Sequence, residues 1–101
     1  MAKKTIVVKI GTSSLTEKSG RLDRVRLRAL TGQVARLRDD GHQVVMVTSA
    51  AIAAGYSLLG YHERPVSVPA KQASAAVGQG LLMEEYSRCL AEHGYVAAQL
   101  L

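Results

Sequence analysis

The chain has 101 residues, about the length of one domain, and 48% of them are apolar while 21% are charged, which is ordinary for a globular protein in water. Its uncharged apolar stretches are shorter than the roughly 20 residues that a membrane-spanning helix needs, and its one cysteine excludes an internal disulfide. We therefore expect a cytoplasmic protein with no membrane partner.

The net charge of +5 raises the alternative of a nucleic-acid binder. Much of this excess lies in residues 21–40, where aliphatic side chains recur at helical spacing and arginines occupy the other directions. The aliphatic set is Leu27, Leu30, Val34 and Leu37, and the arginine set is Arg24, Arg28, Arg36 and Arg38. Such a pattern is typical of the solvated face of a surface helix, and no aromatic platform or recognition motif accompanies it. We expect no specific nucleic-acid partner.

Strands and helices are expected to alternate along the chain. In chain order they are a strand over residues 4–10, a helix over 23–40, a strand over 42–49, a short alanine-rich helix over 49–60, a long helix over 69–93 and a strand over 95–101. Gly41 and Gly94 are suited to end the two longer helices, and Pro69 suits the first turn of the last one.

This alternation predicts βαβ units with right-handed crossovers, and so an α/β fold: a three-layer α/β/α sandwich with a mainly parallel sheet. The first two strands are continuous apolar runs, which is typical of parallel strands covered on both faces. Three parallel strands alone would leave apolar faces and an edge uncovered. We therefore expect residues 1–101 to be the N-terminal portion of a larger domain, with no second domain; the alternative is a small domain closed by self-association.

The first candidate site follows the first strand, in "KIGTSS", because ligands of open α/β sheets bind beyond the carboxyl ends of the strands. Gly11 permits close approach of a ligand to the backbone, Thr12 and Ser13 offer hydroxyl groups, and such a turn can form a concave anion site. Lys9 would supply a positive charge to a transferring phosphoryl group. The alternative is a lysine that simply extends from the strand end into water.

The second candidate site lies in "VTSAAIAAG", where Thr48 and Ser49 stand between a strand and a helix. Free backbone N–H groups and the helix dipole favour a carboxylate or a phosphate there. The alternative is that Ser49 only caps the helix and binds no ligand.

Several other sites are excluded or disfavoured. The chain has no GxxxxGK[ST] loop, no GxGxxG motif and no GxSxG elbow. His42, His62 and His93 are too widely separated to predict a metal site, and we expect none. The segment "AAVGQG" indicates close helix packing rather than a phosphate loop, and Lys71 is interpreted as a surface lysine.

Three segments, "VVKIGTSSLT", "GHQVVMVTSAAIAAG" and "KQASAAVGQGLLM", together resemble the glutamate 5-kinases, a branch of the amino acid kinase family. The resemblance covers nearly all of the chain in the correct order. Acetylglutamate, aspartate, carbamate and uridylate kinases have similar first strands but differ in the second and third segments.

The resemblance implies ATP-dependent phosphorylation of the γ-carboxylate of L-glutamate to γ-glutamyl phosphate, the first step of proline biosynthesis, with Mg²⁺ on the nucleotide. It implies that Lys9 contacts the ATP phosphates and steadies the transferring group as the catalytic lysine. Gly11, Thr12 and Ser13 match the loop beside it, and Ser49 matches a serine that contacts glutamate. It also implies a homo-oligomer and handover of the product to glutamate-5-semialdehyde dehydrogenase.

The chain departs from this pattern in two respects. Ala50 stands where the resembling enzymes usually have a glycine, so at this substrate-binding position an added methyl is expected to narrow the space for substrate. Those enzymes also continue well beyond residue 101, so we expect residues 1–101 alone to be inactive. The alternatives are another enzyme of this fold, of the acetylglutamate or aspartate kinase type, and a non-catalytic oligomerisation or binding module.

Overall fold

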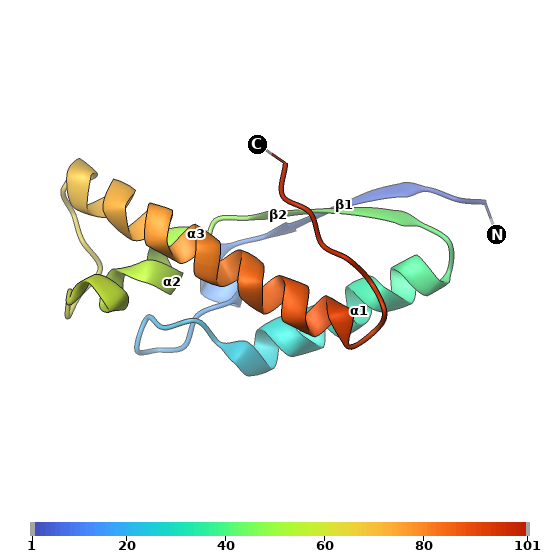
Figure 1. Cartoon of the computed structure of the whole chain (residues 1–101), viewed down its shortest axis with the longest axis horizontal. Helices are drawn as coiled ribbons and strands as arrows, with labels where there is room; N and C mark the ends of the chain where they lie inside the picture. The colour runs from blue at the N-terminus through green and yellow to red at the C-terminus, as the bar shows by residue number, and fades with distance from the viewer. Residues whose placement is uncertain (1, 101) are drawn as a thin grey trace.

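A computed structural model describes residues 2–100 (Figure 1). Its elements are strand β1 (Thr5–Ile10), 3-10 turn η1 (Thr12–Ser14), helix α1 (Arg24–Asp39), strand β2 (Gln43–Thr48), helix α2 (Ala51–Gly55), 3-10 turn η2 (Tyr56–Leu59) and helix α3 (Val68–Ala91). The order expected from the sequence is confirmed as far as α3. None of the described helices has the length and apolar character required to cross a membrane.

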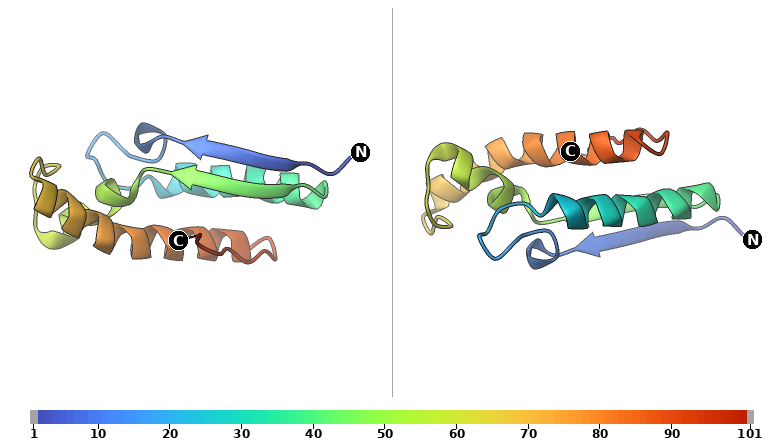
Figure 2. Two further views of the ribbon diagram at one scale, coloured as in Figure 1. Left: turned by 90° about the horizontal axis from the view of Figure 1, so that it is seen from above. Right: turned by 90° about the horizontal axis from the view of Figure 1, so that it is seen from below.

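The two strands pair in parallel, and their carboxyl ends therefore lie at one edge of the sheet. Lys9 is in register with Val47, and Ile10 with Thr48. Helix α1 connects the two strands in the sequence and runs back along one face of the sheet, while η1 and α2 follow the strand ends (Figure 2). This is the βαβ unit of an α/β fold, as expected.

One face of the sheet is covered by helices and the other is open. Ile10 at the end of β1 is buried, whereas Val7 is 64% exposed and Val47 is 47% exposed on the opposite face. An open face is what we expect of the N-terminal portion of a larger sandwich. Burial alternates along β1, because a strand turns successive side chains to opposite faces. Two of the three expected layers are present.

The core lies between the sheet, α1 and α3. It consists of aliphatic and small side chains with one buried tyrosine and one cysteine, and its members are Ile10, Leu15, Leu27, Ala50, Ala54, Leu82, Tyr86 and Cys89. Leu15 comes from the loop after η1, so the first candidate loop is anchored in the core by its own side chain.

The two longer helices, α1 and α3, begin at residues that cap them. The side chain of Asp23 accepts a hydrogen bond from the backbone N–H of Arg26 at 3.1 Å and caps α1. Ser67 caps α3 in the same way through the N–H of Ala70 at 3.4 Å. Gly41, with φ +93°, follows α1 in a left-handed conformation that favours glycine.

The third strand, expected over residues 95–101, is wrong for 95–100, which are irregular; residue 101 lies outside the described residues. Gly94, with φ +81°, turns the chain, and the N–H of Tyr95 returns to the carbonyl of Leu90 at 3.0 Å. The Tyr95 hydroxyl donates to the Asp39 carboxylate at the end of α1, and the Arg38 guanidinium lies 5.4 Å from the Tyr95 ring centroid. A strand forms only beside a pairing partner, and within residues 2–100 none pairs with this segment.

Candidate functional site

Lys9 is the last exposed side chain of β1, on the open face of the sheet. Because its side chain is exposed, water can solvate the charge, and Lys9 needs no acidic partner within the protein. Within residues 2–100 no acidic side chain forms an ion pair with it. Two arginines of α1 do form such pairs, with Glu85 of α3 and with Glu92 just after it. The ammonium group is therefore available to an anion that arrives at the carboxyl edge of the sheet.

Thr12 and Ser49 join the two candidate loops directly. The Oγ1 atom of Thr12 lies 3.0 Å from the carbonyl oxygen of Ser49 and 2.9 Å from its Oγ. These residues are 37 positions apart in the sequence, and the parallel register brings them together because each lies just beyond the carboxyl end of its strand. The two loops predicted to form one site do lie at one place.

Gly11 and Ser13 flank Thr12 on the exposed side of the first loop. A Cβ built on Gly11 would meet no atom of the chain within 4 Å, so the space beside this backbone is open to a ligand. The carbonyl of Ser13 accepts a hydrogen bond from the Arg26 guanidinium at 3.4 Å, which ties η1 to the first turn of α1.

The alternative interpretation of Ser49 as a helix cap is wrong. The N-cap position of α2 is Ala50, with no side-chain cap, and the Ser49 hydroxyl bonds to Thr12 instead. Helix α2 spans only the five residues Ala51–Gly55, so the expected helix dipole that would favour an anion is correspondingly weak. The hydroxyl groups of the loop and the charge of Lys9 are therefore the features that favour a ligand here.

Ala50 lies in the hydrophobic core and not on the surface of the second loop. It is fully buried within the hydrophobic core, and its φ of −85° is a conformation that any residue adopts. Its methyl group therefore points away from solvent. The strained φ that an alanine would resist is therefore not present, and the substrate-binding role expected of Ala50 stays a prediction.

Thr48 and Tyr86 lie next to Ala50, the last residue of the second loop. Thr48 Oγ1 accepts a hydrogen bond from the N–H of Ala50 at 3.4 Å. The Tyr86 hydroxyl, on α3, is buried without a hydrogen bond of ordinary geometry to any described residue. Burial raises the pKa of Tyr86, and the neighbouring Thr48 hydroxyl lowers it by a smaller amount. Sequence reasoning missed Tyr86, because periodicity places it on a helix but cannot show what lies opposite.

The loops themselves contain no carboxylate: residues 9–14 and 48–50 are apolar, hydroxyl-bearing or basic. Among the described residues, no group of three or more histidine, cysteine, aspartate or glutamate side chains could hold a metal ion. The arrangement is suited to an anionic ligand, with one ammonium group and several hydroxyls at the edge of a sheet.

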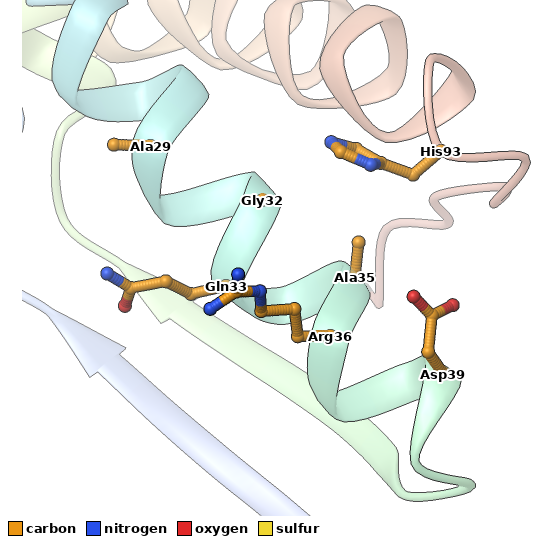
Figure 3. A pocket seen from close by; sticks show the side chains of 7 residues that line it. All are labelled: Ala29, Gly32, Gln33, Ala35, Arg36, Asp39 and His93. Atoms are coloured by element: carbon orange, nitrogen blue, oxygen red, sulfur yellow. The ribbon is translucent and has the colours of Figure 1, made fainter.

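A separate groove of about 500 Å³ runs between α1 and the end of α3 (Figure 3). Its lining residues are Ala29, Gly32, Gln33, Ala35, Arg36, Asp39 and His93. It includes none of the residues predicted for the site, and it lies along the part of α1 that leads away from the carboxyl edge of the sheet (Figures 2 and 3).

Residues 4–101 match the sequence model of the amino acid kinase family. The chain is 54% identical over 101 residues to a glutamate 5-kinase of Streptococcus suis, covering all of this chain and 28% of the relative. It is 54% identical over 98 residues to glutamate 5-kinase 2 of Bacillus subtilis, covering 97% of this chain and 26% of the relative. A glutamate 5-kinase of Neisseria gonorrhoeae is 52% identical over 101 residues, which is all of this chain and 34% of that protein.

The chain thus spans between about a quarter and a third of the length of these curated relatives. The match to the family covers almost the whole chain, and it includes both loops that the fold brings together at the carboxyl edge of the sheet. The chain belongs to the amino acid kinase family.

Proposed function

We propose that this chain carries part of the active site of a glutamate 5-kinase, which transfers the γ-phosphoryl group of ATP to the γ-carboxylate of L-glutamate. The observation that carries the proposal is the contact between Thr12 and Ser49, which unites the two loops beside the exposed charge of Lys9. The names of the matched relatives supply the reaction, since all three are glutamate 5-kinases. Because those relatives are much longer, we propose that residues 1–101 are the N-terminal portion of the kinase domain.

In the proposed step a γ-carboxylate oxygen of glutamate attacks the γ-phosphorus of ATP. A new P–O bond forms, the bond to the bridging β-phosphate oxygen breaks, and ADP leaves with that electron pair. The products are γ-glutamyl phosphate and ADP. Both reactants are anionic, so the chemistry depends mainly on holding them in line and on balancing charge in the transition state.

Lys9 is proposed as the catalytic residue that balances this charge. Its ammonium group would contact the ATP phosphates and follow the transferring group. A unit charge about 4 Å away contributes on the order of 4 kcal/mol at an effective dielectric near 20, before desolvation is subtracted. The open space beside Gly11 and the hydroxyl of Ser13 would receive phosphate oxygens, and the hydroxyl of Ser49 would contact glutamate.

Mg²⁺ would accompany the nucleotide. Carboxylate and phosphate oxygens are its preferred ligands, and residues 9–14 and 48–50 contain no carboxylate. The donor set of these loops therefore fits a metal held by ATP phosphates rather than by this part of the chain. When bound, the metal would neutralise part of the phosphate charge, and Lys9 would supply the protein's share.

The proposed product, γ-glutamyl phosphate, is an acyl phosphate and is prone to hydrolysis. Direct handover to the next enzyme, glutamate-5-semialdehyde dehydrogenase, would protect it from water. We also propose a homo-oligomer, which the resemblance to the glutamate 5-kinases implies.

The test uses the natural polypeptide that contains this sequence, in an assay that couples ADP release to a spectroscopic signal. Lys9→Ala is expected to lower kcat by about 10²- to 10³-fold, as the loss of one transition-state contact does. Lys71→Ala, which removes an exposed lysine on α3, is the matched control and is expected to leave kcat unchanged. Unchanged turnover by the Lys9 variant would exclude this lysine as the phosphoryl stabiliser.

Glutamate, aspartate, N-acetylglutamate and UMP are compared as acceptors in the same assay. Glutamate is expected to have the highest kcat/KM. A higher value for another acceptor would replace the proposed substrate while leaving the family intact. Residues 1–101 alone are expected to show no turnover, and measurable ADP release by them would contradict the proposal that they hold only part of the site.

A further inference from the structure

The hydroxyl group of Thr12 has both of its hydrogen-bonding functions directed at Ser49. Its Oγ1 lies 3.0 Å from the Ser49 carbonyl oxygen and 2.9 Å from the Ser49 Oγ. A carbonyl oxygen can only accept, so the first contact requires Thr12 to donate its single proton. In the second contact the donor must then be the Ser49 hydroxyl.

This proton count leaves Thr12 with nothing to donate to a phosphate. Phosphate oxygens only accept hydrogen bonds, so a protein group that binds a phosphate must donate a proton to it. The Thr12 proton is engaged with the Ser49 backbone. The exposed hydroxyl of Ser13 and the ammonium of Lys9 keep their donors, and they lie on either side of Thr12 in the sequence.

Thr12 is also held in place from its own side. Its carbonyl oxygen accepts hydrogen bonds from the Thr16 hydroxyl at 3.1 Å and from the N–H of Leu15 at 3.1 Å. Leu15 is 1% exposed, so this turn is fixed to the core. The Thr12 hydroxyl is therefore held in one position, and its hydrogen bond orients the exposed Ser49 side chain.

We propose that Thr12 is a positioning residue which fixes the Ser49 Oγ as a hydrogen-bond acceptor for the ammonium group of the amino-acid substrate, and that its side chain is not a phosphate ligand. The Ser49 proton is engaged with Thr12, so the Ser49 oxygen accepts from the substrate and does not donate to it. This assignment rests on the proposed function, in which Ser49 contacts glutamate. It differs from the role that the family resemblance implies for Thr12, namely a place in the loop that receives the ATP phosphates. It couples the two loops, so that the geometry of the acceptor site depends on the loop that follows Lys9.

The test compares Thr12→Val, which keeps the shape and removes the hydroxyl, with Thr12→Ser, which keeps the hydroxyl. In the natural polypeptide, Thr12→Val is expected to raise KM for glutamate about tenfold, the size of effect that one or two lost hydrogen bonds produce, while KM for ATP changes less than about twofold. Thr12→Ser is expected to restore most of the glutamate affinity. Thr5→Val, the same change at the other end of β1 where Thr5 bonds to Gln43, is the matched control.

The double variant separates positioning from direct contact. If Thr12 acts through Ser49, Thr12→Val is expected to add little to the KM increase of Ser49→Ala, because the two residues form one unit. The assignment would be overturned if the double variant raised KM for glutamate by the product of the two single effects. A rise in KM for ATP with KM for glutamate unchanged would overturn it as well.

A second readout does not depend on activity. Urea unfolding of the single and double variants of the natural polypeptide is expected to show non-additive changes in the unfolding free energy, because the two side chains contact each other directly. Coupling in unfolding, together with no glutamate-dependent ADP release by the unsubstituted natural polypeptide, would reject the proposed function alone. Additive unfolding changes would reject the Thr12–Ser49 unit itself.

Discussion

Gly55 of α2 and Gly78 of α3 pack backbone against backbone. A Cβ on Gly78 would overlap the carbonyl oxygen of Ala51 and would lie 2.7 Å from the nitrogen of Gly55. A Cβ on Gly55 would likewise overlap the carbonyl oxygen of Ser74. This close approach holds α2 against α3, and with it the loop that carries Ser49.

Gly78→Ala is expected to destabilise the chain by about 1–3 kcal/mol, because the added methyl has no space and the two helices must separate. Gly80→Ala, two residues on, is the matched control, since a Cβ there meets nothing within 4 Å. It is expected to stabilise α3 by up to about 1 kcal/mol, the difference in helix propensity between the two residues. Urea unfolding followed by circular dichroism measures both. Equal effects of the two variants would show that the glycine contact contributes nothing.

Much of this fold could be predicted from the sequence because its signals are local. The aliphatic period of α1, its start near Asp23, the glycines after the two longer helices and the apolar strands each depend on neighbouring residues. The segment "AAVGQG" was also predicted to pack closely, and Gly78 does so. The strand over residues 95–100 failed because strand formation depends on a partner, which no local pattern contains.

The candidate site was predictable in outline and not in its contacts. Parallel strands bring Lys9 and Ser49 to one edge, and this follows from the alternation of elements alone. The pairing of Thr12 with Ser49 depends on the register of the strands, and the burial of Ala50 depends on the path of the chain after Thr48. Residue spacing determines neither the register nor this path, so the interpretation of Ser49 as a helix cap was wrong and the burial of Ala50 was not foreseen.

Asp23→Ala tests whether the cap sets the start of α1. The substitution removes the acceptor of the Arg26 N–H, and it is expected to lower the unfolding free energy by about 1 kcal/mol. Asp40→Ala removes an equal charge at the other end of α1, where a negative charge opposes the helix dipole, so it is expected to be neutral or slightly stabilising. Urea unfolding at neutral pH compares the two variants. A loss in the Asp40 variant as large as in the Asp23 variant would show that charge, and not the cap, is responsible.

Tyr86→Phe tests the buried hydroxyl below the Ser49 loop. At neutral pH the variant is expected to be more stable by about 1 kcal/mol, because a buried hydroxyl without a partner costs free energy. Burial raises the pKa of Tyr86 above 10.0, so the folded chain favours the neutral phenol. Ionisation of Tyr86 therefore does not affect the free energy of unfolding below about pH 10, the ordinary tyrosine pKa. The free energy of unfolding falls as the pH rises from there through the raised pKa, because the unfolded chain loses this proton first.

Unfolding free energies measured from about pH 8 to about pH 11.5 check this sign, since this range spans the ordinary tyrosine pKa of about 10. The Phe variant is expected to lose less stability above about pH 10 than the unsubstituted chain. Tyr61→Phe, at an exposed tyrosine, is the control and is expected to follow the unsubstituted chain. Identical alkaline losses in all three proteins would mean that Tyr86 ionises as freely in the folded chain as in the unfolded one.

The open face of the sheet predicts that residues 1–101 associate when they are isolated. Val7 and Val47 lie on this face with large exposed fractions, and apolar surface of this kind favours contact with a second copy. The double substitution Val7→Thr and Val47→Thr preserves the branched shape of the side chains but makes the face polar, and it is expected to weaken association by about tenfold or more. Val25→Thr alters an exposed valine on α1 and is expected to leave association unchanged. Sedimentation velocity over a range of concentrations distinguishes the three proteins. If the unsubstituted chain is a monomer at every concentration, the exposed valines do not drive self-association.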